Sequence, residues 1–161
     1  LLLASGADVN ARNKDGMTRL HELGSAEVIE LLLANGADVN ARDRYENTPL
    51  HVACHRDCLC GRSDLHGRVV LNEEGSEAEG SPCPEVKEVV MLLLANGADV
   101  NAKTTFGRTP LHAASSVDII ELLLANGADV NARDRRGNTP LAIQNRHKIA
   151  AECLKRHGAT Q

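Results

Sequence analysis

The apolar positions of the chain recur in blocks of nearly identical sequence. The run Leu-Leu-Leu-Ala-Asn-Gly-Ala-Asp-Val-Asn-Ala occupies residues 31–41, 92–102 and 122–132, and residues 1–11 repeat it with Ser5 in place of Asn. The blocks start 30, 61 and 30 residues apart. Self-similarity at a fixed period is typical of repeat proteins. The pattern therefore predicts an array of similar units in which one interval is about a whole unit too long.

A second phrase with the same spacing marks where helices begin. It reads Thr-Pro-Leu-His in two units and varies slightly in the others, starting at Thr18, Thr48, Thr109 and Thr139. The Thr hydroxyl can cap a free backbone N–H, and Pro fits the first position of a helix. We expect inner helices to begin at Pro49, Pro110 and Pro140, and a weaker helix start where Arg19 replaces the Pro.

A second helix in each unit is predicted to carry the Leu-Leu-Leu block. Ser25 and Ser116 stand shortly before an acidic residue, which favours a helix N-terminus. The Asn-Gly pair after the block is typical of a helix end whose Gly is left-handed, as expected at Gly36, Gly97 and Gly127. The residues that follow predict an extended finger ending in a Gly turn, at Gly16, Gly107 or Gly137. Glu46 replaces the turn Gly in the remaining finger.

This unit of helix, turn, helix and projecting loop resembles the ankyrin repeat. The resemblance rests on the Thr-Pro-Leu-His phrase, the Leu-Leu-Leu-x-x-Gly-Ala-Asp-Val-Asn-Ala block and the Asp-x-x-Gly-x-Thr-Pro run at 134–140. It implies an all-α ankyrin-repeat solenoid of stacked helix-turn-helix units with projecting loop or β-hairpin fingers. Each unit of such a stack contacts only its neighbours. Two units here have 30 residues where the family has about 33, and the missing residues fall between the two helices.

The repeats divide a single domain, 1–161, into five parts. We expect a partial repeat at 1–17, repeats at 18–47, 48–108 and 109–138, and a C-terminal capping repeat at 139–161. Lys155 takes the place of the third Leu in the last block, which fits an end that faces water. The long interval holds an inserted loop at about 57–84. Because the chain opens within a unit and without Met, we interpret it as part of a longer protein.

Composition and charge narrow the function. Charged residues make up 25% of the chain and apolar residues 42%, as in ordinary globular proteins. The net charge is −4, and the acidic run at 71–85 accounts for the excess, so nucleic acid is not a favoured partner. No apolar run reaches the length of a membrane span. The five Cys show no regular disulfide spacing, so we expect a reducing, cytoplasmic location.

Two sets of recurring polar residues are interpreted as structural. His21, His51 and His112 share one repeat position, and in the ankyrin family this His forms hydrogen bonds around the Thr-Pro turn. A recurring Asn of each block is expected to fix its loop through side-chain hydrogen bonds to the backbone; the residues are Asn10, Asn40, Asn101 and Asn131. In the family, such Asn residues can also be substrates for hydroxylation.

Four cysteines lie in and around the long interval. They are Cys54, Cys58, Cys60 and Cys83, with His55 and His66 nearby. Such side chains could bind zinc tetrahedrally, but their spacing matches no common zinc motif, so reduced thiols are the favoured interpretation. We therefore expect no metal and no cofactor, and keep a zinc-stabilised insertion with its own binding role as an alternative.

The finger tips are the positions that do not repeat. Directly before the turn Gly, or its replacement, stand Asp15, Tyr45, Phe106 and Arg136, and one residue earlier stand Lys14, Arg44, Thr105 and Arg135. Tyr45 and Phe106 are the only aromatic residues of the chain. An exposed aromatic residue on a loop held by a rigid scaffold is typical of a protein interface. The alternative is that both rings pack across neighbouring fingers.

Two further sets of residues flank these tips. The inner helices should form a concave groove beside them, lined by Glu22, Val52, Ala113 and Ile143. Basic side chains border the fingers and favour a partner with an acidic surface; they are Arg12, Arg42, Lys103, Arg108 and Arg133.

Motifs of catalysis are missing from the sequence: it has no Gly-rich phosphate loop, no HExxH and no nucleophile elbow. We therefore predict a monomeric, non-catalytic interaction module that binds a protein partner through its finger tips and concave face. The alternative is that these repeats recruit the substrate of a larger enzyme or effector whose catalytic domain lies outside this chain.

Overall fold

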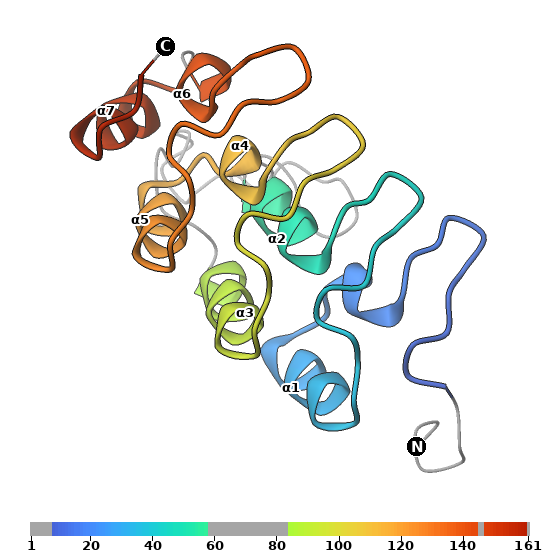
Figure 1. The fold of residues 1–161 in the computed structure, drawn as a ribbon. Helices are drawn as coiled ribbons and strands as arrows, with labels where there is room; N and C mark the ends of the chain where they lie inside the picture. Colours follow the sequence, from blue (N-terminus) through green and yellow to red (C-terminus); the bar gives the residue numbers. More distant parts are fainter. Residues whose placement is uncertain (1–7, 58–83, 145–146, 161) are drawn as a thin grey trace, which may run out of the picture.

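The stack consists of two rows of helices with loops projecting on one side (Figure 1). The computed structural model describes residues 8–57, 84–144 and 147–160. The inner row contains the 3-10 helix η2 (Arg19–Glu22) and the α-helices α2 (Pro49–Asp57), α4 (Pro110–Ala113) and α6 (Pro140–Ile143). The outer row contains α1 (Ala26–Ala34), α3 (Pro84–Ala95), α5 (Val117–Ala125) and α7 (Lys148–Arg156). This is the predicted all-α solenoid.

The helix boundaries follow the predicted signals. α2, α4 and α6 begin at the prolines, and Arg19 starts only a 3-10 turn. The hydroxyl of Ser116 accepts a hydrogen bond from the N–H of Ile119 at the start of α5. Outer helices end at a Gly with φ between +83° and +87°, as expected for a left-handed helix end; these are Gly36, Gly97, Gly127 and Gly158.

The inner helices are the elements that are short in this stack. η2, α4 and α6 have four residues each, whereas α2 has nine. The unit that contains the long interval therefore has the longest inner helix, and its outer helix α3 is also the longest of the described helices, with 12 residues. The rest of the inserted loop, 58–83, lies outside the described residues.

One continuous core runs through the stack. Two columns of Leu residues run through this core, and each of these residues is no more than 5% exposed. They are Leu20, Leu50, Leu111 and Leu141 from the inner row, and Leu32, Leu93, Leu123 and Leu154 from the outer row. Burying such a side chain contributes about 1.5–3 kcal/mol. Lys155, which takes the place of the third Leu in the last block, is exposed next to this column, and the capping role of this unit stays a prediction.

Side-chain hydrogen bonds of the block Asn residues connect successive loops. Each Nδ2 donates to the carbonyl of the helix-ending Gly in the next unit, at 2.9–3.2 Å, from Asn10, Asn40, Asn101 and Asn131 to Gly36, Gly97, Gly127 and Gly158. Each Oδ1 accepts a backbone N–H of the same next loop at 2.7–2.8 Å. The expected structural role of these Asn residues is confirmed.

The fingers are loops closed by hydrogen-bonded turns, and no strand occurs in the described residues. Within those same residues, none of the helices has the length and apolar character that crossing a membrane requires.

Two turn glycines provide a matched test of how closely the fingers stack. Both are left-handed, with φ of +74° at Gly107 and +80° at Gly137. An added Cβ would lie 3.0 Å from the backbone N of Arg135 at Gly107 but would meet nothing within 4 Å at Gly137. We expect Gly137→Ala to lower the free energy of unfolding by about 1–2 kcal/mol through backbone strain alone. Gly107→Ala should lower it further, by about 1 kcal/mol or more, because the fingers must separate. Equal losses in urea unfolding would contradict this account.

Candidate functional site

Each finger tip is a tight turn held by one side chain. We define the finger tips as residues 13–16, 43–46, 104–107 and 134–137. The first residue of each tip accepts the backbone N–H groups two and four positions later; these residues are Asn13, Asp43, Thr104 and Asp134. Sequence analysis did not single out this column. The signal was available, since Asp-x-x-Gly appears in the repeat motif and short polar residues favour such turns.

The finger tips are also bonded to one another. The N–H of Arg44 donates to the carbonyl of Asp15, that of Thr105 to Tyr45, and that of Arg135 to Phe106, each at 2.9 Å. These are the positions predicted to recognise a partner. Their backbones are therefore fixed in one continuous edge, while their side chains remain available at the surface.

Both aromatic side chains lie at the surface of this edge. Phe106 is 61% exposed and Tyr45 is 45% exposed. The guanidinium of Arg44 lies 4.8 Å from the centre of the Tyr45 ring and pairs with the carboxylate of Asp15 at 2.7 Å. The position of Tyr45 is thus supported from the preceding finger. Packing across fingers leaves about half or more of each ring uncovered.

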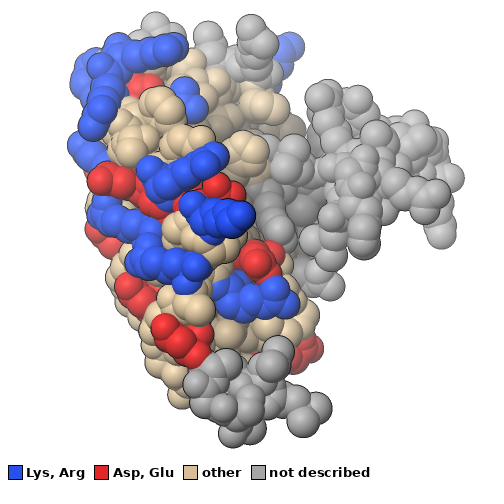
Figure 2. Space-filling view, turned by 90° about the vertical axis from the view of Figure 1, so that its right-hand side faces the viewer, with Lys and Arg blue, Asp and Glu red and all other residues tan. Residues whose placement is uncertain are grey.

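Charge is distributed unevenly along the finger tips (Figure 2). At the first two fingers, Arg44 pairs with Asp15, and Arg42 approaches Glu46 at 3.4 Å. Six basic side chains of the fingers form no ion pair with any described residue: Arg12, Lys14, Lys103, Arg133, Arg135 and Arg136. Most of these belong to the third and fourth fingers, so the uncompensated positive charge gathers at the C-terminal end of the edge.

The predicted concave column lies on the inner helices, beside the fingers. Glu22 is exposed on η2 and pairs with Arg19. Val52, Ala113 and Ile143, on α2, α4 and α6, are partly buried. Ile143 is the last residue of its helix. The column therefore offers less accessible surface than the tips.

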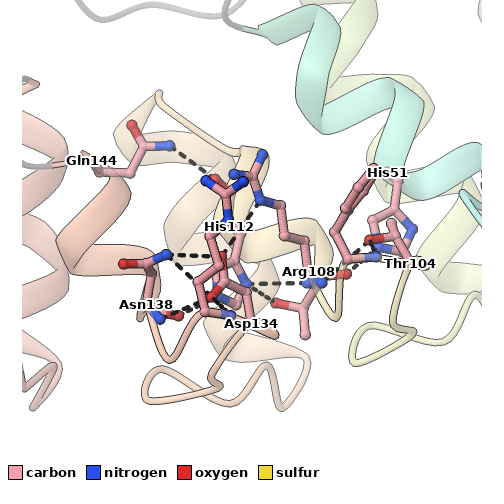
Figure 3. Close-up of polar contacts among 10 residues, drawn as sticks. His51, Thr104, Arg108, His112, Asp134, Asn138 and Gln144 are labelled. Carbon is pink, nitrogen blue, oxygen red and sulfur yellow. Dashed lines mark hydrogen bonds and ion pairs between the residues drawn. The ribbon is translucent and has the colours of Figure 1, made fainter.

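The three recurring histidines connect η2, α2 and α4 to the next finger, and Figure 3 shows two of them, His51 and His112. In His51, Nδ1 accepts the backbone N–H of Thr48 at 3.2 Å, and Nε2 lies 3.0 Å from the carbonyl of Arg108. A carbonyl can only accept, so Nε2 carries the proton and the ring is neutral. His21 and His112 repeat this pattern with the carbonyls of Asn47 and Asn138. Their predicted structural role is confirmed.

The position of the His ring changes how the Thr residue contributes to capping the inner helix. In units with a His, the Thr hydroxyl lies 2.9–3.0 Å from Nδ1 of the ring. In the last unit Ala142 replaces the His, and there the hydroxyl of Thr139 accepts the N–H of Ala142 as predicted. The His ring thus takes over part of the capping that the sequence assigned to Thr.

Burial lowers the pKa of His51 to about 4 from its ordinary 6.5, against the opposing effect of the carbonyl of Arg108. The pKa of His112 is lowered as well, again mainly by burial. Asp134 differs, because burial alone would raise its pKa, but hydrogen bonds from Asn138 and the N–H of Arg136 outweigh burial and lower it. Asp134 also approaches Arg108 at 3.7 Å (Figure 3).

These shifts predict acid sensitivity between pH 6.5 and 4. In this window the unfolded chain binds a proton at position 51 and the folded chain does not, so acid favours unfolding. We expect the free energy of unfolding to fall by about 2 kcal/mol between pH 7 and 5 from His51, with His112 adding to the loss. His51→Ala should be less stable at pH 7 but show a shallower pH dependence, whereas His55→Ala, on the exposed side of α2, should keep the parent slope. An unchanged slope in His51→Ala, measured by urea unfolding, would exclude this mechanism.

Most of the Cys and His residues considered as zinc ligands lie outside the described residues. Cys54 is buried, and His55 is exposed. Cys58, Cys60, His66 and Cys83 are not among the described residues, so the zinc-stabilised insertion stays a prediction.

Comparison with known families agrees with this architecture. The stacked pairs of helices define a helical-repeat solenoid. A family model described as ankyrin repeats (3 copies) matches residues 1–62, and one described as ankyrin repeats (many copies) matches residues 91–143. The chain belongs to the ankyrin-repeat family. No curated protein matches it. Ankyrin repeats are generally protein–protein interaction modules and are typically non-catalytic.

Proposed function

We propose that this chain binds a protein partner through its row of finger tips, with Tyr45 and Phe106 as the apolar anchors. The observation that carries the proposal is the exposure of both rings, 45% and 61%, on turns whose backbones are bonded to their neighbours. Aromatic side chains dominate the binding energy of many interfaces. Here the only two of the chain stand at neighbouring tips.

Binding by these tips requires little ordering of the protein. Each tip is closed by an internal side chain and is bonded to the next tip through the backbone, and the Asn side chains fix the base of each finger. Association loses less conformational entropy when the binding loops are ordered in advance. The edge therefore favours a partner with a matching rigid surface.

Charge indicates the chemistry of that partner. Apolar recesses should face Tyr45 and Phe106, and an acidic patch should face the third and fourth fingers, where Arg135 and Arg136 are exposed. Rim charges of this kind mainly speed association and select the partner. The inner-helix positions form the flank of the same surface: Glu22, Val52, Ala113 and Ile143. We propose a monomer in a reducing, cytoplasmic location, which fits the lack of a regular disulfide spacing among the five Cys.

The anchors can be tested with a double variant, Tyr45→Ala with Phe106→Ala. Tyr45 is 45% exposed and Phe106 is 61% exposed, so we expect little change in melting temperature, while affinity for the partner should fall about 30-fold or more. The matched control is Leu31→Ala with Met91→Ala, which removes side chains 55% and 50% exposed from the outer row. Capture from native cells with parent, double variant and control identifies the partner, and calorimetry then measures each affinity. Equal loss in the control, or unchanged binding in the double variant, would sink the proposal.

The charge argument has its own test in Arg135→Gln with Arg136→Gln. With the captured partner, association should slow about tenfold at low salt, and the difference from the parent should shrink as ionic strength rises. Lys148→Gln with Lys155→Gln removes the same charge from α7, in the outer row, and should have little effect on association. Stopped-flow kinetics at several salt concentrations distinguish these outcomes. A salt-independent difference, or an equal effect of the α7 variant, would show that the basic tips do not face an acidic surface.

A further inference from the structure

Three side chains of different chemistry converge where α5 meets α7. They are Glu121 of α5, Cys153 of α7 and His157 at the end of α7. One ligand atom of each, a carboxylate oxygen, the thiol sulfur and an imidazole nitrogen, lies within 4.8 Å of the other two. Cys153 and His157 are four residues apart and therefore lie on the same face of the helix. Cys153 is buried whereas the other two are exposed, so a cation there would sit at the surface with the thiol beneath it.

The repeats provide an internal comparison for this cluster. The same three repeat positions hold Glu30, Leu92 and Asn96 at the junction of α1 with α3, and Met91, Leu122 and Asn126 at the junction of α3 with α5. Leu and Met side chains fill these places with apolar volume, and the Asn amides donate to the carbonyl of the preceding turn at 2.8 Å. Along the described part of the stack, the last junction alone replaces both the Leu and the Asn with metal-binding residues.

The ring of His157 does not take over the role of the Asn it replaces. The amides of Asn96 and Asn126 bond to Leu92 and Leu122, but the imidazole of His157 forms no hydrogen bond with any residue in 8–57, 84–144 or 147–160. The carboxylate of Glu121 is likewise without a hydrogen bond or ion pair in these residues. Both groups therefore retain their capacity to coordinate a cation.

We propose that Glu121, Cys153 and His157 form a zinc site that joins α7 to α5. Thiolate, imidazole and carboxylate are the three side-chain ligands that Zn²⁺ takes in proteins, and three of them with a water molecule complete a tetrahedral site. The thiol of Cys153 loses its proton to solvent as the Zn–S bond forms. A bound ion connects residues of two successive units, 32 positions apart between Glu121 and Cys153.

The consequence concerns the interface between α5 and α7. Each unit of a repeat stack is held by its interfaces with neighbouring units, and local opening of a helix breaks such an interface. Zinc would tie α7 to α5, which packs against it, and slow this opening. The site thus makes the order of the C-terminal unit depend on metal, independently of partner binding at the finger tips.

Co²⁺ is the probe for this site, because thiolate ligation gives a near-ultraviolet charge-transfer band and tetrahedral geometry gives strong visible absorption. We expect one equivalent to bind the full 161-residue chain with both signals, and Zn²⁺ to displace it. Cys153→Leu and His157→Asn restore the residues of the other junctions and should fold. The first should abolish the thiolate band, and the second, like Glu121→Gln, should weaken binding about tenfold or more.

A triple variant, Cys58→Ser with Cys60→Ser and Cys83→Ser, separates this site from the thiols of the insertion and should bind like the parent. In hydrogen exchange, Zn²⁺ should slow the amides of α7 in the parent and in the triple variant but not in Cys153→Leu. The proposal is overturned if the parent shows no thiolate band, if Cys153→Leu keeps it, or if the triple variant loses it.

Discussion

The hydrogen bonds that pass from one unit to the next determine the geometry of this molecule. Each block Asn bonds to the following loop through both ends of its amide, and each recurring His reaches the following finger through Nε2. The core between units is made of small aliphatic side chains, which pack well but specify orientation poorly. Directional polar bonds supply the missing orientation. Packing of the helices holds the units together, and the hydrogen bonds of the Asn and His columns fix the position of each unit relative to the next.

The sequence was sufficient to predict the scaffold because the scaffold is what repeats. Helix starts at Pro49, Pro110 and Pro140 and helix ends at the left-handed glycines follow from local chemistry that acts within a few residues. The tip positions were predicted too, since variation against a constant background is visible in the sequence. The bonds between tips, the pairing of Arg44 with Asp15 and the resulting concentration of free positive charge at the far end depend on how fingers stack, and no local signal encodes them.

The cluster on α5 and α7 escaped sequence analysis for a similar reason. Cysteines are dense in the long interval, whereas Cys153 stands alone in a Leu column, where a small apolar residue is expected for packing. Glu121 and His157 belong to different units, and only the stacking of one outer helix on the next brings their side chains together. Comparing equivalent positions at each junction, once the repeat register is known, is the way such sites can be found.

The hydrogen bonds between Asn40 and the loop at Gly97 separate two properties that usually go together. One is the length of chain that joins two units, and the other is the geometry in which those units stack. These residues are 57 positions apart in the sequence, about twice the separation of their counterparts. The hydrogen bonds of the Asn40 side-chain amide nevertheless have lengths similar to those of the other block Asn residues. His51 reaches Arg108 across the same interval with the same geometry as His21 reaching Asn47. The units on either side of the long interval are therefore aligned by the same hydrogen bonds that join units of ordinary spacing. Length in the intervening segment is free to vary in evolution without moving the finger tips relative to one another.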